Sequence, residues 1–496
     1  MRRTEYKVIL PLANEKSKLL LWAEGDNFFM FNTKKHEQFL NTYTNGIHLY
    51  LNIKNFDSLV KNDEADNDVS RIIHFLNAFV STLERFVSDK YRDNVYFEKL
   101  TGSRIHLIIY GGKDIQPKIF LSVSFFAAMI AKRMMDISKY KSIPNVAIQI
   151  GADYGYFFGY EFSQGDYSEY TSIGYSANIG CKLQCLAKQN EIVFSNEIKS
   201  LMPIADRLFS TLDDERQKSI SKKYPNCKAY TISSVSLAST YKTLSDNNLF
   251  LNFKLDDIDS YYDYANQIAN KTNITDMDVI APKKLYFSNW NVSKSAYIEN
   301  AIVVYADVRG FTKQFNKDDS NLLSMAFKTK TILSQMFDEC DAYDGSHVQF
   351  QGDRECALFP PKHEKEAVLF ALKLQQEINE KVQNVGIGIG INKGKVFATQ
   401  IGLNSETFSL QKQNIILGKT VIECNRLEDS EASVGETVIS SNAYQSLPQL
   451  VQKLFKPRNN YWFTNKKFSD YMSLAERDIV NENNSIGSFK PWREKQ

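Results

Sequence analysis

The 496-residue sequence lacks the features that mark several large classes of protein. Its 60 basic and 58 acidic residues leave a net charge of +2, and the basic residues are dispersed. This balance argues against a protein that coats nucleic acid or binds membranes through a polybasic surface. The most apolar run, at 119–130, is too short to span a bilayer, so we expect a buried helix there. We expect no signal peptide and a cytoplasmic protein, because the first residues contain only a brief apolar stretch.

Cysteine is also scarce, and no CxxC motif occurs among the six cysteines, at 181, 185, 227, 340, 356 and 424. This pattern suits a reducing compartment better than a disulfide framework or a zinc site. Cys181 and Cys185 lie one helical turn apart, and we interpret them as residues that pack a helix. Glycine and repeated proline are sparse in the polar stretch 232–298. That composition predicts an ordered connector, with a helix near 256–270, in preference to a flexible linker.

Two segments of the chain share one order of predicted elements, which indicates an internal repeat. Each has a strand, a strand pair, a helix, a second long strand and a final helix. In the C-terminal copy these elements fall, in the same order, at 302–308, at 346–359, at 363–380, from Val385 and near Gly418. In the N-terminal copy they fall from Ile47, at 96–110, at 119–137, from Val146 and near Gly174. Alternating strands and helices of this kind predict an α/β layer in which helices cover a sheet.

Two of the predicted strands carry one aspartate each, at or just past the apolar part. Asp307 lies in AIVVYADVRGFT, and Asp353 lies 46 residues later in HVQFQGDRECALF. A carboxylate crowded by apolar residues needs a partner to stay charged. Hard cations prefer carboxylate oxygens, so the pair predicts two Mg²⁺ or Mn²⁺ ions. The plainer alternative is that each aspartate caps a helix or lies in a loop.

The heptad at 306–312, ADVRGFT, resembles the first-strand signature of the class III nucleotidyl cyclases almost letter for letter. The resemblance implies a ferredoxin-like βαββαβ core in each copy of the repeat, and an intrachain pseudodimer of α/β (α+β) domains. It also implies a reaction, in which a ribose 3′-hydroxyl attacks its own α-phosphate and pyrophosphate leaves. The same resemblance places Asp307, Val308 and Asp353 at the metal ions, and Phe311 and Thr312 at the substrate.

The family's substrate-reading positions fall in the N-terminal copy. By resemblance, Lys99 and Thr171 contact the base, Asn178 orients the ribose, and Lys182 replaces the arginine that stabilises the transition state. The C-terminal copy has Gln349, Ile415, Ile422 and Arg426 at those places, and the N-terminal copy has Asn52 and Ser103 at the two metal positions. The resemblance therefore implies one productive and one degenerate site. Without it, the four readers would be ordinary strand, turn and helix residues.

Two departures from the family pattern bear on catalysis. Lysine offers a point charge, not the bidentate fork of arginine, so Lys182 is a real change. Many relatives also place an arginine on the glycine-rich strand, where this chain has Gly388 and, in the other copy, Gln149. Arg309, or the pair Lys222 and Lys223, are the candidates to meet the charge of the triphosphate instead.

We divide the chain at the limits of the repeat, into an extension (1–43), a reading domain (44–231), a connector (232–298), a metal-binding domain (299–445) and a tail (446–496). No sensor module is recognisable, and standalone diverged cyclases of this kind resemble the pyrimidine cyclases of bacterial Pycsar antiphage systems. That resemblance favours CTP as substrate, cyclic CMP as product and a separate effector protein as partner. The alternatives are an adenylate cyclase, a uridylate cyclase or an inactive nucleotide-binding regulator. We expect a monomer that binds no nucleic acid.

Overall fold

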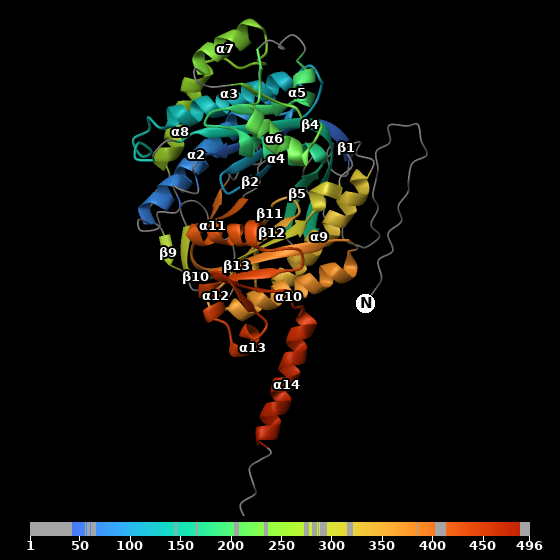
Figure 1. Cartoon of the computed structure of the whole chain (residues 1–496). Coiled ribbons are helices and arrows are strands. Elements are labelled where there is room, and N and C mark those ends of the chain that lie inside the picture. The colour runs from blue at the N-terminus through green and yellow to red at the C-terminus, as the bar shows by residue number, and fades with distance from the viewer. Residues whose placement is uncertain are drawn as a thin grey trace, which may run out of the picture. The chain divides into compact units, whose positions relative to one another are not determined.

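Figure 1 shows the computed structural model of the chain. It describes residues 42–486 except 55, 57–59, 61–65, 144–145, 165–166, 203–207, 233–236, 272–276, 280–284, 286, 288–294, 315–320, 383 and 402–412. The chain forms two compact units, the first comprising 1–274, 312–330 and 401–413, and the second 275–311, 331–400 and 414–496. Most of the extension predicted at 1–43 lies outside the described residues. No described helix is long and apolar enough to cross a membrane.

The first unit is built on a mixed sheet with the described strand order β2-β3-β1-β4-β6-β8-β7, and β5 pairs with β4. Alternate residues of β1 face opposite sides, so Ile47, Leu49 and Leu51 are buried on the face away from His48 and Tyr50. The strands are β1 (Thr42–Ile53), β2 (Val95–Thr101), β3 (Arg104–Ile109), β4 (Ile148–Gln164), β5 (Tyr167–Ile173), β6 (Ile192–Ser195), β7 (Ser210–Thr211) and β8 (Ala229–Ile232).

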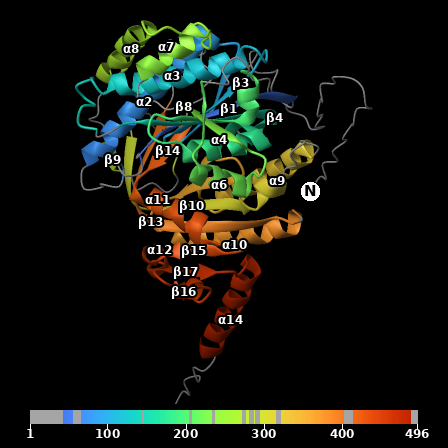
Figure 2. The same ribbon diagram turned by 45° about the horizontal axis from the view of Figure 1, so that its top comes forward.

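Aromatic packing holds the helices of the first unit together. Phe86 of α2 stacks on Phe126 of α3 at 3.7 Å between ring centroids, and Tyr261 of α8 packs edge-on against both rings. The apolar run at 119–130 is the buried part of α3, as the sequence predicts. Figures 1 and 2 show α7 and α8 beside α3. The helices are α2 (Asp66–Tyr91), α3 (Gln116–Met134), α4 (Tyr175–Leu186), α5 (Asn196–Ser200), α6 (Asp214–Lys223), α7 (Leu237–Asp246) and α8 (Asp257–Lys271).

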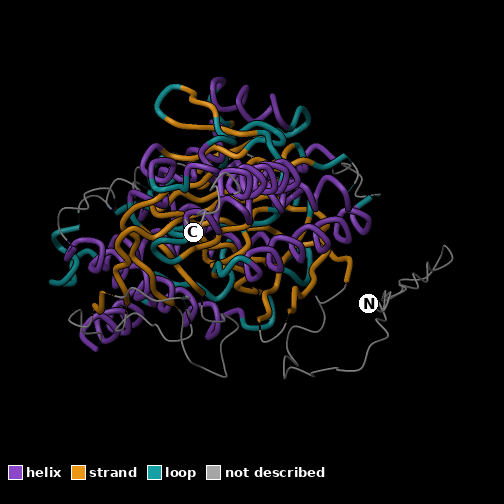
Figure 3. The backbone as a smooth tube through the Cα atoms, turned by 90° about the horizontal axis from the view of Figure 1, so that it is seen from below, coloured by secondary structure: helices purple, strands orange, loops and turns teal. Residues whose placement is uncertain are grey.

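The second unit repeats the first strand for strand, with the order β11-β12-β10-β13-β15-β17-β16 and β14 on β13. The predicted repeat and the predicted α/β layer are thus confirmed. β9 (Met277–Val279) is an addition beside β10. The other strands, orange in Figure 3, are β10 (Ser295–Arg309), β11 (Ser346–Phe350), β12 (Arg354–Phe359), β13 (Gly386–Ile401), β14 (Gln413–Leu417), β15 (Thr437–Ser440), β16 (Lys456–Arg458) and β17 (Tyr461–Thr464).

The helices of the second unit include α10 (Glu364–Lys381), within a residue of the prediction at each end, and α11 (Lys419–Arg426), which continues as a π-helical turn, η4 (Leu427–Glu431). The unit also contains α12 (Ser441–Gln445), α13 (Gln449–Gln452) and α14 (Phe468–Ile486). The residues of η3 (Phe311–Gln314) and of α9 (Leu322–Ala342) are divided between the two units. The sheet extends past residue 445, because β16 and β17 form a hairpin that pairs with β15. These strands are too short for an alternating pattern to reveal them.

The strand registers align the two copies residue by residue. Asn52 pairs with Arg104 between β1 and β3, and Asp307 pairs with Arg354 between β10 and β12. The register shifts just before Lys99 in β2 and just before Gln349 in β11. Helices α4 and α11 both begin after a glycine, Gly174 and Gly418.

The two cysteines of α4 differ from the sequence interpretation. Cys181 is half-buried, but Cys185 is exposed. Cys185 therefore does not pack the helix, and the interpretation is wrong for that residue. A guanidinium nitrogen of Arg104 lies 3.6 Å from its sulfur.

Candidate active site

The structure brings Asp307 and Asp353 together at one end of a strand pair. Asp307 lies on β10 opposite Arg354, and Asp353 immediately precedes Arg354 in the turn between β11 and β12. Burial raises the pKa of Asp353 well above its usual range, and repulsion from Asp307 adds to the effect. Burial also raises the pKa of Asp307, against the attraction of Arg354 and Arg309. Two carboxylates that resist ionisation together are a fitting place for a cation.

A third acidic residue, Glu428, stands behind this pair and was missed by the sequence reasoning. It lies in η4 with only 1 % of its surface exposed. Its carboxylate oxygens lie 2.5 Å from Arg309 Nη2 and 2.5 Å from Arg354 Nη2. Arg309 also reaches Asp307, with Nη1 3.5 Å from Oδ2. The two arginines therefore connect Glu428 to the aspartates of the site.

The charges of this cluster do not balance. Asp307, Asp353, Glu428 and Asp429 influence one another's ionisation, and among the described residues Arg309 and Arg354 are the cations that act most strongly on them. Burial raises the pKa of Glu428 to about 7, against the attraction of Arg354 and with added repulsion from Asp307. An excess of carboxylate oxygens fits hard divalent cations. The side chain of Val308 is buried, so its backbone carbonyl is the group that could join such a cation.

The remaining predicted residues of this half follow β10 directly. Gly310 adopts a positive φ of +70°, a backbone conformation that favours glycine, and the chain then enters η3. Phe311 is buried at the start of η3, and the side chain of Thr312 lies outside the described residues. Phe311 therefore anchors the turn after the strand that carries Asp307.

Arg309 fills the space beside Gly388, the position at which the resemblance led us to expect an arginine. A Cβ atom placed on Gly388 would lie 2.3 Å from Arg309 Nε, so the guanidinium fills the space that a side chain at Gly388 would need. Gly388 is opposite Asp307 in the strand pairing, as Gln149 is opposite Asn52 in the other copy. The loss of an arginine on β13 is thus accompanied by a guanidinium reaching the same place from β10.

In the first unit, the two predicted base-contacting residues touch each other. Lys99 Nζ donates a hydrogen bond of 3.2 Å to Thr171 Oγ1. Lys99 also forms an ion pair with Glu169, and all three side chains are buried. Sequence reasoning missed Glu169, although it lies two residues before Thr171 and hence on the same face of β5. The structure therefore adds a carboxylate acceptor to the predicted pair.

Asn178 and Lys182 lie one turn apart on α4, and both are half-buried. Residues at this spacing lie on the same face of a helix, so the two side chains can act on one ligand. Lys99 and Thr171 bond to each other, and Lys99 pairs with Glu169. The four predicted readers therefore form two pairs, one between β2 and β5 and one on α4.

The first unit has neutral residues where the second has its acids. Ser103 Oγ donates to Asn52 Oδ1 at 2.8 Å, and Asn52 Nδ2 donates to Gln149 Oε1 at 3.4 Å. Arg104 Nε donates to Gln184 Oε1 at 2.8 Å, as Arg354 pairs with Glu428 in the other copy. Asparagine, serine and glutamine complete the hydrogen bonds without negative charge. This set does not suit two divalent cations.

Comparison with known proteins supports this division. Residues 293–472 match the family described as the adenylate and guanylate cyclase catalytic domain. The second unit thus carries a domain of this cyclase family, as the heptad at 306–312 predicts. No curated protein sequence gives a significant match.

One solved structure shares the fold over both copies. A class III adenylyl cyclase-like ATP-binding protein from Pseudomonas aeruginosa matches with a TM-score of 0.65 and 18% identity, covering 87% of this chain and 90% of that one. The adenylyl cyclase CyaB from P. aeruginosa matches at 18% identity and a TM-score of 0.29, over 34% of this chain and 94% of that one. The guanylate cyclase domain of RhGC from Catenaria anguillulae, in complex with GTP, matches at 22% identity and a TM-score of 0.29, over 34% and 99%.

Proposed function

We propose that the chain is a cyclase that converts CTP into 3′,5′-cyclic CMP and pyrophosphate, with one productive site per chain. The observation that carries the proposal is the division of residues between the two copies. The acidic cluster of Asp307, Asp353 and Glu428 occurs in the second unit, and neutral residues replace it in the first. Lys99, Thr171 and Asn178 occur in the first, and the second has Gln349, Ile415 and Ile422 instead.

The residues divide the chemistry between them. Two Mg²⁺ or Mn²⁺ ions, held by Asp307, Asp353 and the carbonyl of Val308, would make the 3′-hydroxyl more acidic and offset the triphosphate charge. Asn178 orients the ribose by hydrogen bonding, and Lys182 places a positive charge beside the anionic transition state. Arg309 supplies a further cation beside the acidic pair.

The polar groups around Lys99 fit a base with an amino group. Lys99 donates and Glu169 accepts, and cytosine and adenine both offer an amino donor beside a ring-nitrogen acceptor. Of these two, the resemblance to the standalone Pycsar cyclases favours cytosine. In that setting cyclic CMP would act as a second messenger in antiphage defence and bind a separate effector protein.

An assay of the purified chain with each labelled triphosphate and Mn²⁺ tests the proposal. We expect cyclic CMP to exceed the other products, and Asp307→Asn to abolish it. Cyclic AMP or cyclic UMP as the main product would overturn the choice of base and leave the cyclase intact. If the folded wild-type protein forms no cyclic nucleotide from any triphosphate, the proposed cyclase activity is wrong.

A second candidate is a protein that uses or only binds ATP. The observation in its favour is the two-unit relative from P. aeruginosa, which is described as ATP-binding. The Lys99–Glu169 pair also fits the amino group of adenine. Calorimetry with ATP and CTP, together with the product assay, separates the two candidates. A protein that only binds nucleotide gives a dissociation constant and forms no product.

A further inference from the structure

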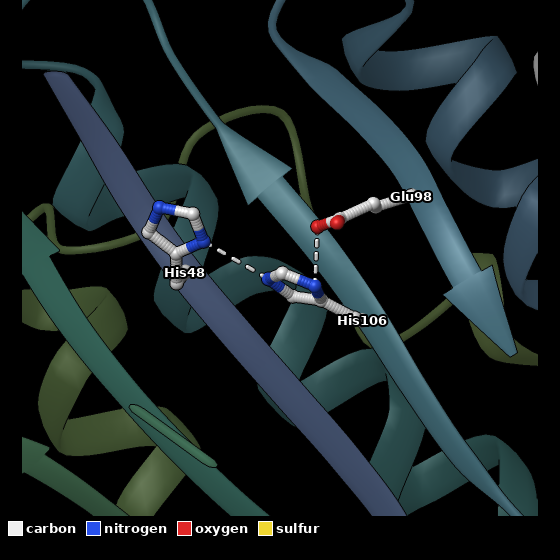
Figure 4. A group of neighbouring side chains, drawn as sticks. All are labelled: His48, Glu98 and His106. Carbon is white, nitrogen blue, oxygen red and sulfur yellow. Dashed lines mark hydrogen bonds and ion pairs between the residues drawn. The ribbon is translucent and has the colours of Figure 1, made fainter. Parts of the chain in front are cut away.

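A buried polar chain lies beside the base-contacting pair of the first unit. Figure 4 shows His48, His106 and Glu98, which come from β1, β3 and β2. His48 Nδ1 lies 3.0 Å from His106 Nε2, and His106 Nδ1 pairs with the Glu98 carboxylate. The ring of Tyr50 stacks on that of His106 at 4.1 Å between centroids. These four residues are not among those that the family motifs predict to act on the substrate or the metals.

The far end of the chain is fixed to the strand that carries Thr171. Glu98 accepts hydrogen bonds from Ser172 N at 2.9 Å and from Ser172 Oγ at 2.7 Å. Lys99, the next residue of β2, donates to Thr171, the preceding residue of β5. The backbone partners of β2 and β5 are β3 and β4 respectively, so side chains make these links between the two strands.

Glu98 stands at the point where the register of β2 shifts against β3, between Phe97 and Lys99. A β-bulge redirects the side chains around it, so the anchoring of Glu98 helps to decide where Lys99 points. Burial opposes ionisation of Glu98, yet the attraction of His106, Lys99 and His48 lowers its pKa to about 2. Glu98 is therefore a charged acceptor at neutral pH, which makes its bonds to Ser172 strong ones.

The second unit shows that the fold does not require polar residues here. The register places Val303, Val348 and Cys356 at the positions of His48, Glu98 and His106. These three belong to an apolar cluster that also contains Tyr305, the counterpart of Tyr50. Buried polar groups are costly unless fully bonded, so a polar chain that an apolar cluster can replace calls for a reason other than folding.

Building on the proposed function, we propose that Glu98, held by His106 and His48, is a positioning residue that sets which base Lys99 and Thr171 accept. It does so by fixing β5 to β2 beside the readers. Selectivity among triphosphates then depends on the hydrogen bonds of Glu98. If Lys99 and Thr171 shift, the binding of a matching base is weakened more than that of a mismatched base. Turnover depends on other residues, Asp307, Asp353 and Lys182.

The experiment compares Glu98→Val, which introduces the residue of the second unit, with Glu98→Gln and Ser172→Ala. The control is Val348→Ala, a buried truncation at the matching bulge of the other copy. For each variant, kcat and KM with all four triphosphates are measured, together with thermal unfolding. We expect Glu98→Val to lower the preference for the favoured base about tenfold, mainly through KM, with kcat changed less than about threefold. Glu98→Gln keeps one acceptor and should retain more of the preference, and the control should lose stability but keep its preference.

Three results would overturn the proposal. The first is an unchanged preference in folded Glu98→Val. The second is an equal loss of kcat/KM for all four triphosphates, as in the control variant. That result would give His48, His106 and Glu98 a purely structural role. Metal analysis of the wild-type protein adds a third, because one tightly held Zn²⁺ per chain that depends on His48 would make these residues metal ligands. If the wild-type protein forms no cyclic nucleotide, the ratio of dissociation constants for the four triphosphates gives the same test by calorimetry, so the proposal is judged apart from the cyclase assignment.

Discussion

The two units of this protein have the same strand order and differ in what they place on it. Around the ends of the central strands, the second unit gathers Asp307, Asp353 and Glu428, and the first unit has Asn52, Ser103 and Gln184. On the sheet face under α4 the contrast is reversed, with a polar chain in the first unit and an apolar cluster in the second. The comparison teaches that the first unit keeps hydrogen bonds but no acidic side chains at these strand ends, whereas its polar chain on the sheet face has only apolar counterparts in the second unit.

The largest expected effect comes from giving the second unit the neutral residue of the first. Asp307→Asn keeps the size of the side chain but removes a cation ligand, so turnover should fall by at least about a hundredfold. The metal-free variant should be as stable as the wild type or more so, because burial raises the pKa of Asp307 and opposes its charge. Product formation and thermal unfolding without metal check both points. Near-normal turnover would show that the acidic copy is not the catalytic one.

The next effect concerns the cation on α4. Lys182→Ala should lower kcat by about ten- to a hundredfold with a smaller change in KM, since the charge acts mainly on the transition state. Lys182→Arg, the residue that the second unit has at Arg426, is the matched control and should keep most of the rate. If the alanine variant raises KM alone, Lys182 binds the ground state and the resemblance fails at this residue.

A smaller effect is expected at the base-contacting pair. Thr171→Ala and Lys99→Ala each remove a hydrogen-bonding group from the proposed base pocket and should reduce discrimination by about 1–3 kcal/mol, roughly 5- to 150-fold in relative kcat/KM. Competition between CTP and the other triphosphates measures this directly. Glu169→Gln is a useful companion, because it leaves a carbonyl acceptor and removes the partner charge of Lys99. Full selectivity in all three variants would place base recognition elsewhere.

The acidic copy should also respond to pH in a defined direction. The folded protein raises the pKa of Asp307 and Asp353, so the protonated forms are favoured. Their contribution to metal-free stability is therefore present at low pH and lost as the pH rises through the raised values. Protons compete with cations for the same oxygens, so stabilisation by Mn²⁺ should grow as the pH rises. Thermal unfolding across pH with and without Mn²⁺ tests this, and Asp307→Asn should weaken the dependence.

The smallest effect on activity is expected in the degenerate copy. Ser103→Ala removes the hydrogen bond to Asn52 and should cost about 1 kcal/mol of unfolding free energy while turnover stays near the wild-type level. Asn52→Ala should behave in the same way. A large loss of activity in either stable variant would mean that the first unit also holds the metals, and the asymmetry between the copies would be lost.

The sequence by itself determined the repeat, the α/β layers and the cyclase domain of the second unit. Long periodic segments such as α3 and the motif around Asp307 carry their structure locally, since alternation and helical spacing follow from burial of one face. Lys99 and Thr171 were found through family spacing, although they lie 72 positions apart in the sequence. Nothing local would have paired them, because that contact exists only once β5 lies beside β2.

Only the tertiary structure revealed Glu428, Glu169 and the chain from His48 to Ser172. Glu428 follows α11 in a π-helical turn and meets Arg354 from 74 residues earlier in the sequence. From the sequence, Gly388 was a position where an arginine is absent. The structure shows that the guanidinium of Arg309 occupies the space beside it. Each of these depends on which strands are neighbours and in what register, a long-range outcome of packing that residue type and spacing do not encode. The chemical groups that single residues offer could therefore be predicted from the sequence. Their hydrogen-bond and ion-pair partners were decided by the fold.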